Sequence, residues 1–92
     1  MNGYSVLLGK AASEMRAFAQ TSEARFFPPE WLEKLAARFE AASGLSESNV
    51  CIEIETLSRY LADSGPTLSE SVPSFGTVID AYQRAKRRQG RL

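Results

Sequence analysis

The sequence contains no histidine and only one cysteine, Cys51. These absences remove Ser-His-Asp triads, Cys-His pairs, histidine-ligated metals and any disulfide within the chain. At 92 residues the chain has room for one domain with one core, and a deep catalytic cleft is not expected at this size. We therefore predict that the protein is not an enzyme and holds no cofactor and no metal. Cys51 is interpreted as a small buried apolar residue in a reducing compartment.

Long apolar runs are also missing. In residues 1–20 the apolar positions are interrupted by Lys10, Glu14 and Arg16. No segment approaches the roughly 18 consecutive apolar residues of a membrane helix, and residues 1–20 lack the basic leader and apolar stretch of a signal peptide. The sequence therefore predicts no membrane span and a cytoplasmic location.

Charge is balanced in total but not along the chain. Residues 81–92 contain five basic residues and no acid, whereas residues 1–80 contain six bases and eleven acids, a net charge of −5. We expect a single domain spanning 1–92 that ends in a basic, frayed tail at residues 86–92. The arginines of this tail and the one just before it form a candidate second surface: Arg84, Arg87, Arg88 and Arg91. Cations in a last helical turn also complement the helix dipole, so a purely local role remains an alternative.

Apolar residues recur at intervals of three and four, as they do in amphipathic helices. This spacing predicts helices at about 3–20, 29–43, 46–64 and 73–89, with a single turn near 67–71 that begins with a sequence of capping-box form. The predicted fold class is all-α, a compact bundle of four amphipathic helices. Trp31 falls on an inward stripe, and Phe26 and Phe27 are expected to form a buried corner before Pro28.

Two segments of the chain admit a second interpretation. Residues 51–56 alternate between apolar and polar, which is also a strand pattern, although the longer periodicity favours a helix. Residues 41–46 resemble the turn of a helix-turn-helix motif, but the helix after this turn offers Glu47, Glu53 and Glu55 and no base before Arg59. Because phosphate neutralisation dominates affinity for DNA, these acids disfavour nucleic acid as a partner.

Ile52 is out of place on the predicted helix 46–64. With the buried stripe centred on Val50, Ile54, Leu57 and Leu61, Ile52 projects to the far side. Either another segment covers it, or it is an apolar anchor of a protein interface, ringed by charged residues. The candidate partner-binding residues are Glu47, Ile52, Glu53, Glu55, Arg59 and Asp63. Neither Glu53 nor Glu55 has partners for metal or acid-base chemistry, so both are expected on a solvated surface.

Residues 52–66 (IEIETLSRYLADSGP), followed by residues 72–75 (VPSF) and the final basic helix, resemble small all-helical bacterial immunity proteins. These proteins neutralise interbacterial toxins that are encoded beside them. The resemblance covers about the C-terminal half of the chain and implies a way of working rather than particular site residues. It implies a chain that binds a cognate toxin in the producing cell and blocks its active site or holds it inactive.

The leading hypothesis is therefore a non-enzymatic protein-binding inhibitor whose partner is a cognate toxin or another protein. One alternative is a structural or adaptor module that forms a homodimer or higher oligomer through its helices. Another is a small nucleic-acid-binding regulator of the helix-turn-helix kind.

Overall fold

The computed structural model describes residues 2–90, which form six helical elements and contain no strand. These elements are α1 (Ser5–Phe18), the short 3₁₀ helix η1 (Ser22–Phe26), α2 (Pro29–Ala42), α3 (Glu47–Ser64), α4 (Pro66–Ser71) and α5 (Pro73–Gly90). The all-α prediction is confirmed, and the strand alternative for residues 51–56 is wrong because these residues continue α3. Within residues 2–90, none of the helices has both the length and the apolar character needed to cross a membrane.

The ends of the helices follow local sequence signals. Pro29 is the first residue of α2, where its missing N–H costs no helical hydrogen bond. The Ser46 side chain caps α3 by accepting a hydrogen bond from the Asn49 backbone N–H at 3.3 Å. Gly65 ends α3 at φ 91° and ψ 174°, a backbone conformation that is essentially restricted to glycine.

The segment after Gly65 differs from its predicted form. It is the six-residue helix α4, which begins at Pro66, and Gly65 occupies the N-cap position without a side-chain hydrogen bond. The expected capping box starting at Thr67 is therefore not formed. Because Pro66 already supplies a φ angle suited to a first helical turn, the helix starts two residues before the position that the capping-box pattern indicated.

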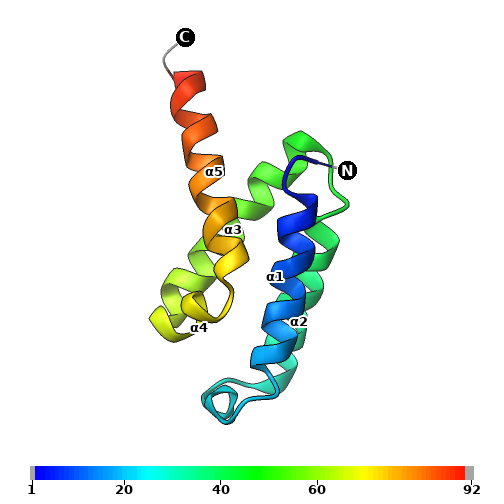
Figure 1. Cartoon of the computed structure of the whole chain (residues 1–92), viewed down its shortest axis with the longest axis vertical. Helices are drawn as coiled ribbons and strands as arrows, with labels where there is room; N and C mark the ends of the chain where they lie inside the picture. The colour runs from blue at the N-terminus through cyan, green and yellow to red at the C-terminus, as the bar shows by residue number, and fades with distance from the viewer. Residues whose placement is uncertain (1, 91–92) are drawn as a thin grey trace.

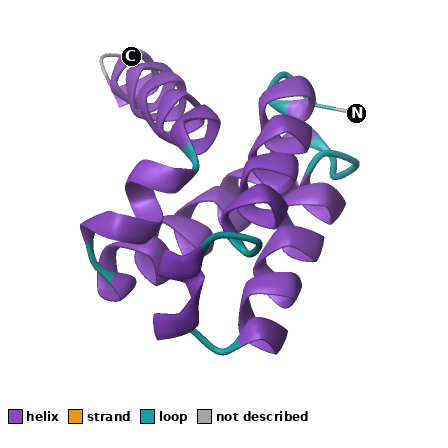
Figure 2. Cartoon of the chain, turned by 60° about the horizontal axis from the view of Figure 1, so that its bottom comes forward, coloured by secondary structure: helices purple, strands orange, loops and turns teal. Residues whose placement is uncertain are grey.

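Helices α1 and α2 lie side by side and form the most extensive helix pair of the molecule (Figure 1). Helix α5 packs against α1 through its N-terminal half, and its C-terminal half rises beyond the other helices. The second view also shows the C-terminal part of α5 standing apart from the α1–α2 pair (Figure 2). The molecule is accordingly elongated, with extents of 47 × 24 × 16 Å. Residues 86–90 of the predicted basic tail continue α5 as helix.

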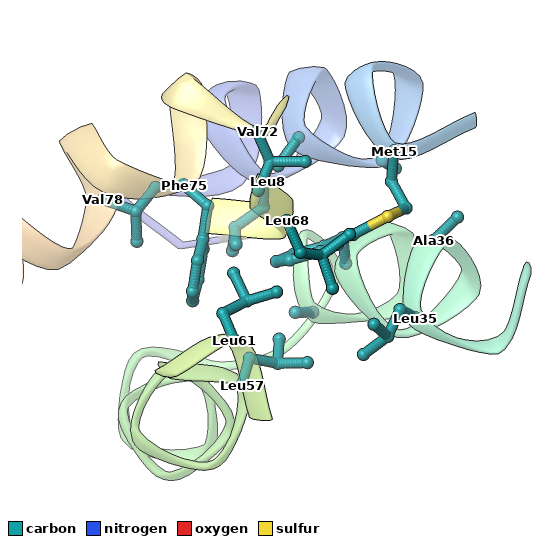
Figure 3. Packing of buried hydrophobic residues seen from close by; sticks show 14 of the residues in the cluster. Leu8, Met15, Leu35, Ala36, Leu57, Leu61, Leu68, Val72, Phe75 and Val78 are labelled. Atoms are coloured by element: carbon teal, nitrogen blue, oxygen red, sulfur yellow. The ribbon is translucent and has the colours of Figure 1, made fainter. Parts of the chain in front are cut away.

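All five α-helices contribute buried side chains to one apolar core. Figure 3 shows Leu57 and Leu61 of α3, Leu68 of α4 and Phe75 of α5 directed toward the same interior. The rings of Phe39 in α2 and Phe75 in α5 meet edge to face, with their centroids 4.8 Å apart. Phe75 therefore anchors the N-terminal half of α5 to the rest of the bundle.

Polar contacts between distant residues fix the helix ends. The Glu14 carboxylate of α1 accepts hydrogen bonds from the Ser74 backbone N–H (3.0 Å) and hydroxyl (2.8 Å), and so caps the first turn of α5. At the other end of α1, the Asn2 side-chain amide donates to the carbonyl oxygens of Ala42 and Leu45, at 3.0 and 2.9 Å. These bonds attach the N-terminus of α1 to the turn between α2 and α3.

The predicted aromatic corner is only half formed. Phe27 packs edge to face on Phe18, with ring centroids 5.9 Å apart, and is half-buried. Phe26 is exposed, at 74% of its full accessibility, and the expectation that it is buried is wrong. It belongs to η1, and in this turn Ala24 takes the buried position. The guanidinium of Arg25 lies over the exposed Phe26 ring at 5.0 Å from its centroid.

Candidate functional site

Ile52 and Tyr60 are exposed on the outer side of α3, at 67% and 42% of their full accessibility. Thr56 lies between them in sequence, and residues four apart on a helix are neighbours on its surface. The three residues therefore form a row about 12 Å long from Ile52 to Tyr60. The possibility that another segment covers Ile52 is excluded by its exposure. The prediction that Ile52 projects away from the core is confirmed.

Arg38 of α2 connects this row to the neighbouring helix. Its guanidinium lies over the Tyr60 ring at 5.1 Å from the centroid, and it donates to both carboxylate oxygens of Glu53, at 2.6 and 3.3 Å. The hydrogen bonds that Arg38 donates to Glu53 raise the pKa of Arg38 above its ordinary value. A bidentate ion pair of this kind fixes both side chains in one geometry. Tyr60 is thereby held between two helices rather than free in solvent.

An aromatic corner continues the surface along α2. The Trp31 ring stacks on Phe27, with centroids 6.0 Å apart and an interplanar angle of 18°. One shallow groove of about 390 Å³ is lined by Phe27, Pro28, Trp31 and Ser64, and a second of about 250 Å³ is lined in part by Trp31, Arg38 and Tyr60. Trp31, predicted to point inward, is only half-buried and borders both grooves. We call the surface made by Phe27, Trp31, Arg38, Ile52 and Tyr60 the α2–α3 face.

The three glutamates predicted for the partner surface bind other parts of the same chain. Glu47, at the start of α3, accepts a hydrogen bond from the Gly3 backbone N–H at 2.7 Å. Glu53 pairs with Arg38, as described, and its side chain is only 20% exposed. The interpretation of Glu53 as a solvated surface residue is therefore wrong, because Arg38 on α2 draws it into a partly buried ion pair.

Glu55 points from α3 toward α5. Its carboxylate accepts hydrogen bonds from the Tyr82 hydroxyl and from the Lys86 ammonium group, both at 3.0 Å. The Lys86 hydrogen bond, followed by that of Tyr82, lowers the pKa of Glu55 below its ordinary value. Burial and then the hydrogen bond to Glu55 raise the pKa of Tyr82. Glu55 thus links α3 to the C-terminal half of α5.

Arg59 and Asp63 remain exposed on α3, at the third and fourth positions of the stripe that begins with Ile52 and Thr56. The structure therefore brings Ile52, Arg59 and Asp63 together on one outward surface. It assigns Glu47, Glu53 and Glu55 to contacts with the N-terminal segment, α2 and α5. Of the predicted second surface, Arg84, Arg87 and Arg88 are exposed on α5, and Arg91 lies outside the described residues.

Residues missed by sequence reasoning make up much of the α2–α3 face: Phe27, Trp31, Arg38 and Tyr60. The sequence offered a signal for Tyr60, which lies at the edge of the apolar stripe of α3. It offered none for the Arg38–Glu53 pair, whose two residues are 15 positions apart on different helices.

Cys51 is half-buried rather than buried, and its thiol donates to the Glu47 carbonyl oxygen at 3.3 Å. Over residues 2–90, no group of three or more His, Cys, Asp or Glu side chains could hold a metal ion. Comparisons with protein-family models, with curated proteins and with solved structures found no match to this chain.

Proposed function

We propose that this protein is a non-enzymatic inhibitor that binds another protein through its α2–α3 face. The observation that carries the proposal is the exposure of Ile52 and Tyr60 on α3, beside the half-buried Trp31 of α2. Isoleucine, tryptophan, tyrosine and arginine side chains are the kind that supply most of the binding energy at protein interfaces. Ile52 lies on the side of α3 that faces away from the core, so packing within the bundle does not account for its apolar side chain.

The surroundings of Ile52 and Tyr60 suit binding of a protein. Arg38 is held by Glu53 and by the Tyr60 ring before any partner arrives, so the rotamer freedom lost on association is reduced. The charged residues Arg59 and Asp63 lie at the rim, where such groups set register and association rate more than affinity. We expect the partner to place an apolar or aromatic side chain in the shallow groove beside Trp31.

The resemblance of residues 52–66 to bacterial immunity proteins supports a toxin as the partner. In that case the chain protects the cell that makes the toxin by holding the toxin inactive. The net charge of −5 in residues 1–80 favours a basic partner, since opposite charge accelerates association. Enzymes that act on nucleic acids have such basic surfaces, which makes a nuclease-like toxin the class that fits best.

The proposal is tested by affinity capture from the native host with tagged wild-type protein and two matched variants. Ile52→Asp places a carboxylate in the α2–α3 face, and Val6→Asp makes the same kind of change at another exposed aliphatic residue, 73% accessible on α1. Both variants should keep the circular dichroism spectrum of the wild type. One partner retained at high salt by the wild type and by Val6→Asp, but lost by Ile52→Asp, is the expected result.

Inhibition is tested with the captured protein itself. Its expression alone should arrest growth, and co-expression of this chain should relieve the arrest unless Ile52→Asp is present. A captured protein that is harmless when expressed alone contradicts the inhibitor proposal. Recovery of this chain as the only bound protein, with a dimeric mass in sedimentation that Ile52→Asp converts to a monomer, would establish the self-associating module instead.

A further inference from the structure

Three arginines line one side of the C-terminal half of α5. Arg84, Arg87 and Arg88 are all exposed, and their spacing of three and four residues places them on one helical face. No hydrogen bond or ion pair within residues 2–90 engages their guanidinium groups. We call these three residues the arginine stripe.

The opposite side of α5 is the side that contacts the bundle. Phe75 and Val78 are fully buried, and Tyr82 and Lys86 reach Glu55 of α3. On a helix of 3.6 residues per turn, Arg84 lies about 160° from Tyr82 and about 180° from Phe75. The arginine stripe therefore points away from the body, on a segment that already extends past the other helices (Figures 1 and 2).

The helix dipole accounts for Arg87 and Arg88, which lie in the last turn of α5, but not for Arg84. Its effect is confined to about the last turn of a helix, and Arg84 lies six residues before Gly90, where α5 ends. The dipole also favours cations at any point around the last turn and does not require them to share a face. Lys86, on the side of α5 that faces α3, forms an ion pair with Glu55. The three arginines have no ion-pair or hydrogen-bond partner among the described residues.

The chemistry of the stripe favours phosphate. The exposed residues in this half of α5 are glutamine, lysine and arginine only, from Gln83 to Gln89, so the segment lacks the apolar centre of a protein interface. The guanidinium group binds phosphate oxygens through two parallel hydrogen bonds, and arginine is enriched where phosphate is bound. Three such groups on one ridge, with no acid in residues 81–92, match a surface of regularly repeated phosphates.

We propose that the arginine stripe binds the phosphate backbone of nucleic-acid duplexes, independently of base sequence and of the α2–α3 face. The acids that disfavour nucleic acid, Glu47, Glu53 and Glu55, lie on α3 and not on the C-terminal half of α5. A contact to three phosphates predicts weak binding that depends strongly on salt. The dissociation constant for B-DNA should rise about 40-fold between 50 and 200 mM salt, from a slope of roughly −2.7 on logarithmic axes.

The test is fluorescence anisotropy of the full chain with a labelled 30-base-pair DNA duplex and with an RNA duplex of the same length, each at several salt concentrations. Arg84→Gln/Arg87→Gln/Arg88→Gln removes the stripe. Lys10→Gln/Arg25→Gln/Lys34→Gln removes three exposed charges elsewhere and is the matched control. Thermal melts of both triple variants verify that the fold is retained.

We expect the wild type and the control to bind at 50 mM salt with the stated salt dependence, and the stripe variant to lose at least tenfold in affinity. DNA and RNA should bind within a few-fold of each other, and Ile52→Asp should bind as the wild type does. Absence of binding at 50 mM salt, or an equal loss in the control, overturns the proposal. Labelled polyglutamate that binds as tightly as DNA at equal charge concentration also overturns it, because the stripe would then be a surface for acidic peptides.

Discussion

Two glutamates on α3 show that the position of a residue around a helix determines which neighbouring helix it contacts. Glu53 and Glu55 are two residues apart and therefore diverge by about 200° around the helix. One reaches Arg38 on α2 and the other reaches Tyr82 and Lys86 on α5. Both look alike in the sequence as surface acids, yet each joins α3 to a different neighbour. Their carboxylates link α3 to α2 and to α5 beside the α2–α3 face.

The contacts of Glu55 predict a stability that depends on pH. Because the pKa of Glu55 is lowered in the folded chain, its contribution is present above its ordinary value of 4.5 and is lost as the pH falls through the folded value. The pKa values of Tyr82 and Lys86 are raised from 10.0 and 10.5, so their contribution is lost as the pH rises beyond those values. Glu55→Gln should therefore destabilise the protein most between about pH 5 and 9.

Urea unfolding of the wild type and of Glu55→Gln at a series of pH values measures this dependence. Glu70→Gln is the control, because Glu70 is an exposed carboxylate on α4 that forms no hydrogen bond within residues 2–90. The gap in unfolding free energy between wild type and Glu55→Gln should close in acid. A gap that stays constant from pH 3 to pH 8, or an equal gap for Glu70→Gln, contradicts the assigned contacts.

At the scale of the helices, the sequence was informative where the signal is local. Apolar periodicity predicted α1, α2, α3 and α5 to within two residues at most ends, and Pro29, Ser46 and Gly65 marked helix ends correctly. The segment containing Phe26 was predicted wrongly, because periodicity does not reveal a 3₁₀ turn that exposes one ring and buries its neighbour. The capping of α5 by Glu14 could not be predicted either, since the two residues are 60 positions apart.

Two glycines should respond in opposite directions to the same substitution. Gly65 joins α3 to α4 at φ 91°, where a Cβ is strained, so Gly65→Ala should cost about 1–3 kcal/mol. Gly76 lies in the first half of α5 with open space around a Cβ, so Gly76→Ala should stabilise by about 0.5–1 kcal/mol. Urea unfolding of both variants checks the signs. Stabilisation by Gly65→Ala would contradict the described junction between α3 and α4.

At the scale of the whole molecule, the chain divides into a packed body and a projecting half-helix. Periodicity identifies the apolar stripes but not the helices that cover them, which is why the sequence left the exposure of Ile52 open. The packing of α2, α4 and α5 on α3 decided this question, because these helices cover the inner side of α3 and leave Ile52 exposed. The Arg38–Tyr60–Trp31 part of the α2–α3 face likewise depends on how α2 and α3 meet.

Phe75 is the largest buried side chain through which α5 joins this body, and its removal should affect the entire fold. Phe75→Ala should cost about 3–5 kcal/mol, from the lost ring and the cavity that remains. A domain of this size has only about 5–14 kcal/mol of stability, so the melting temperature should fall sharply. Val6→Ala, at an exposed site, should change stability by less than about 0.5 kcal/mol. Similar melting temperatures for Phe75→Ala and Val6→Ala would contradict the described core.

The central claim, that the α2–α3 face is the protein-binding surface, is tested most directly by amide hydrogen exchange on the complex with the captured partner. The account predicts added protection, relative to the free chain, in residues 27–31, around Arg38 and in residues 52–60. The exposed side of α1 around Val6 should exchange as it does in the free chain. Protection confined to α1 near Val6, or to residues 84–88 of α5, would contradict the account and place the partner on another surface.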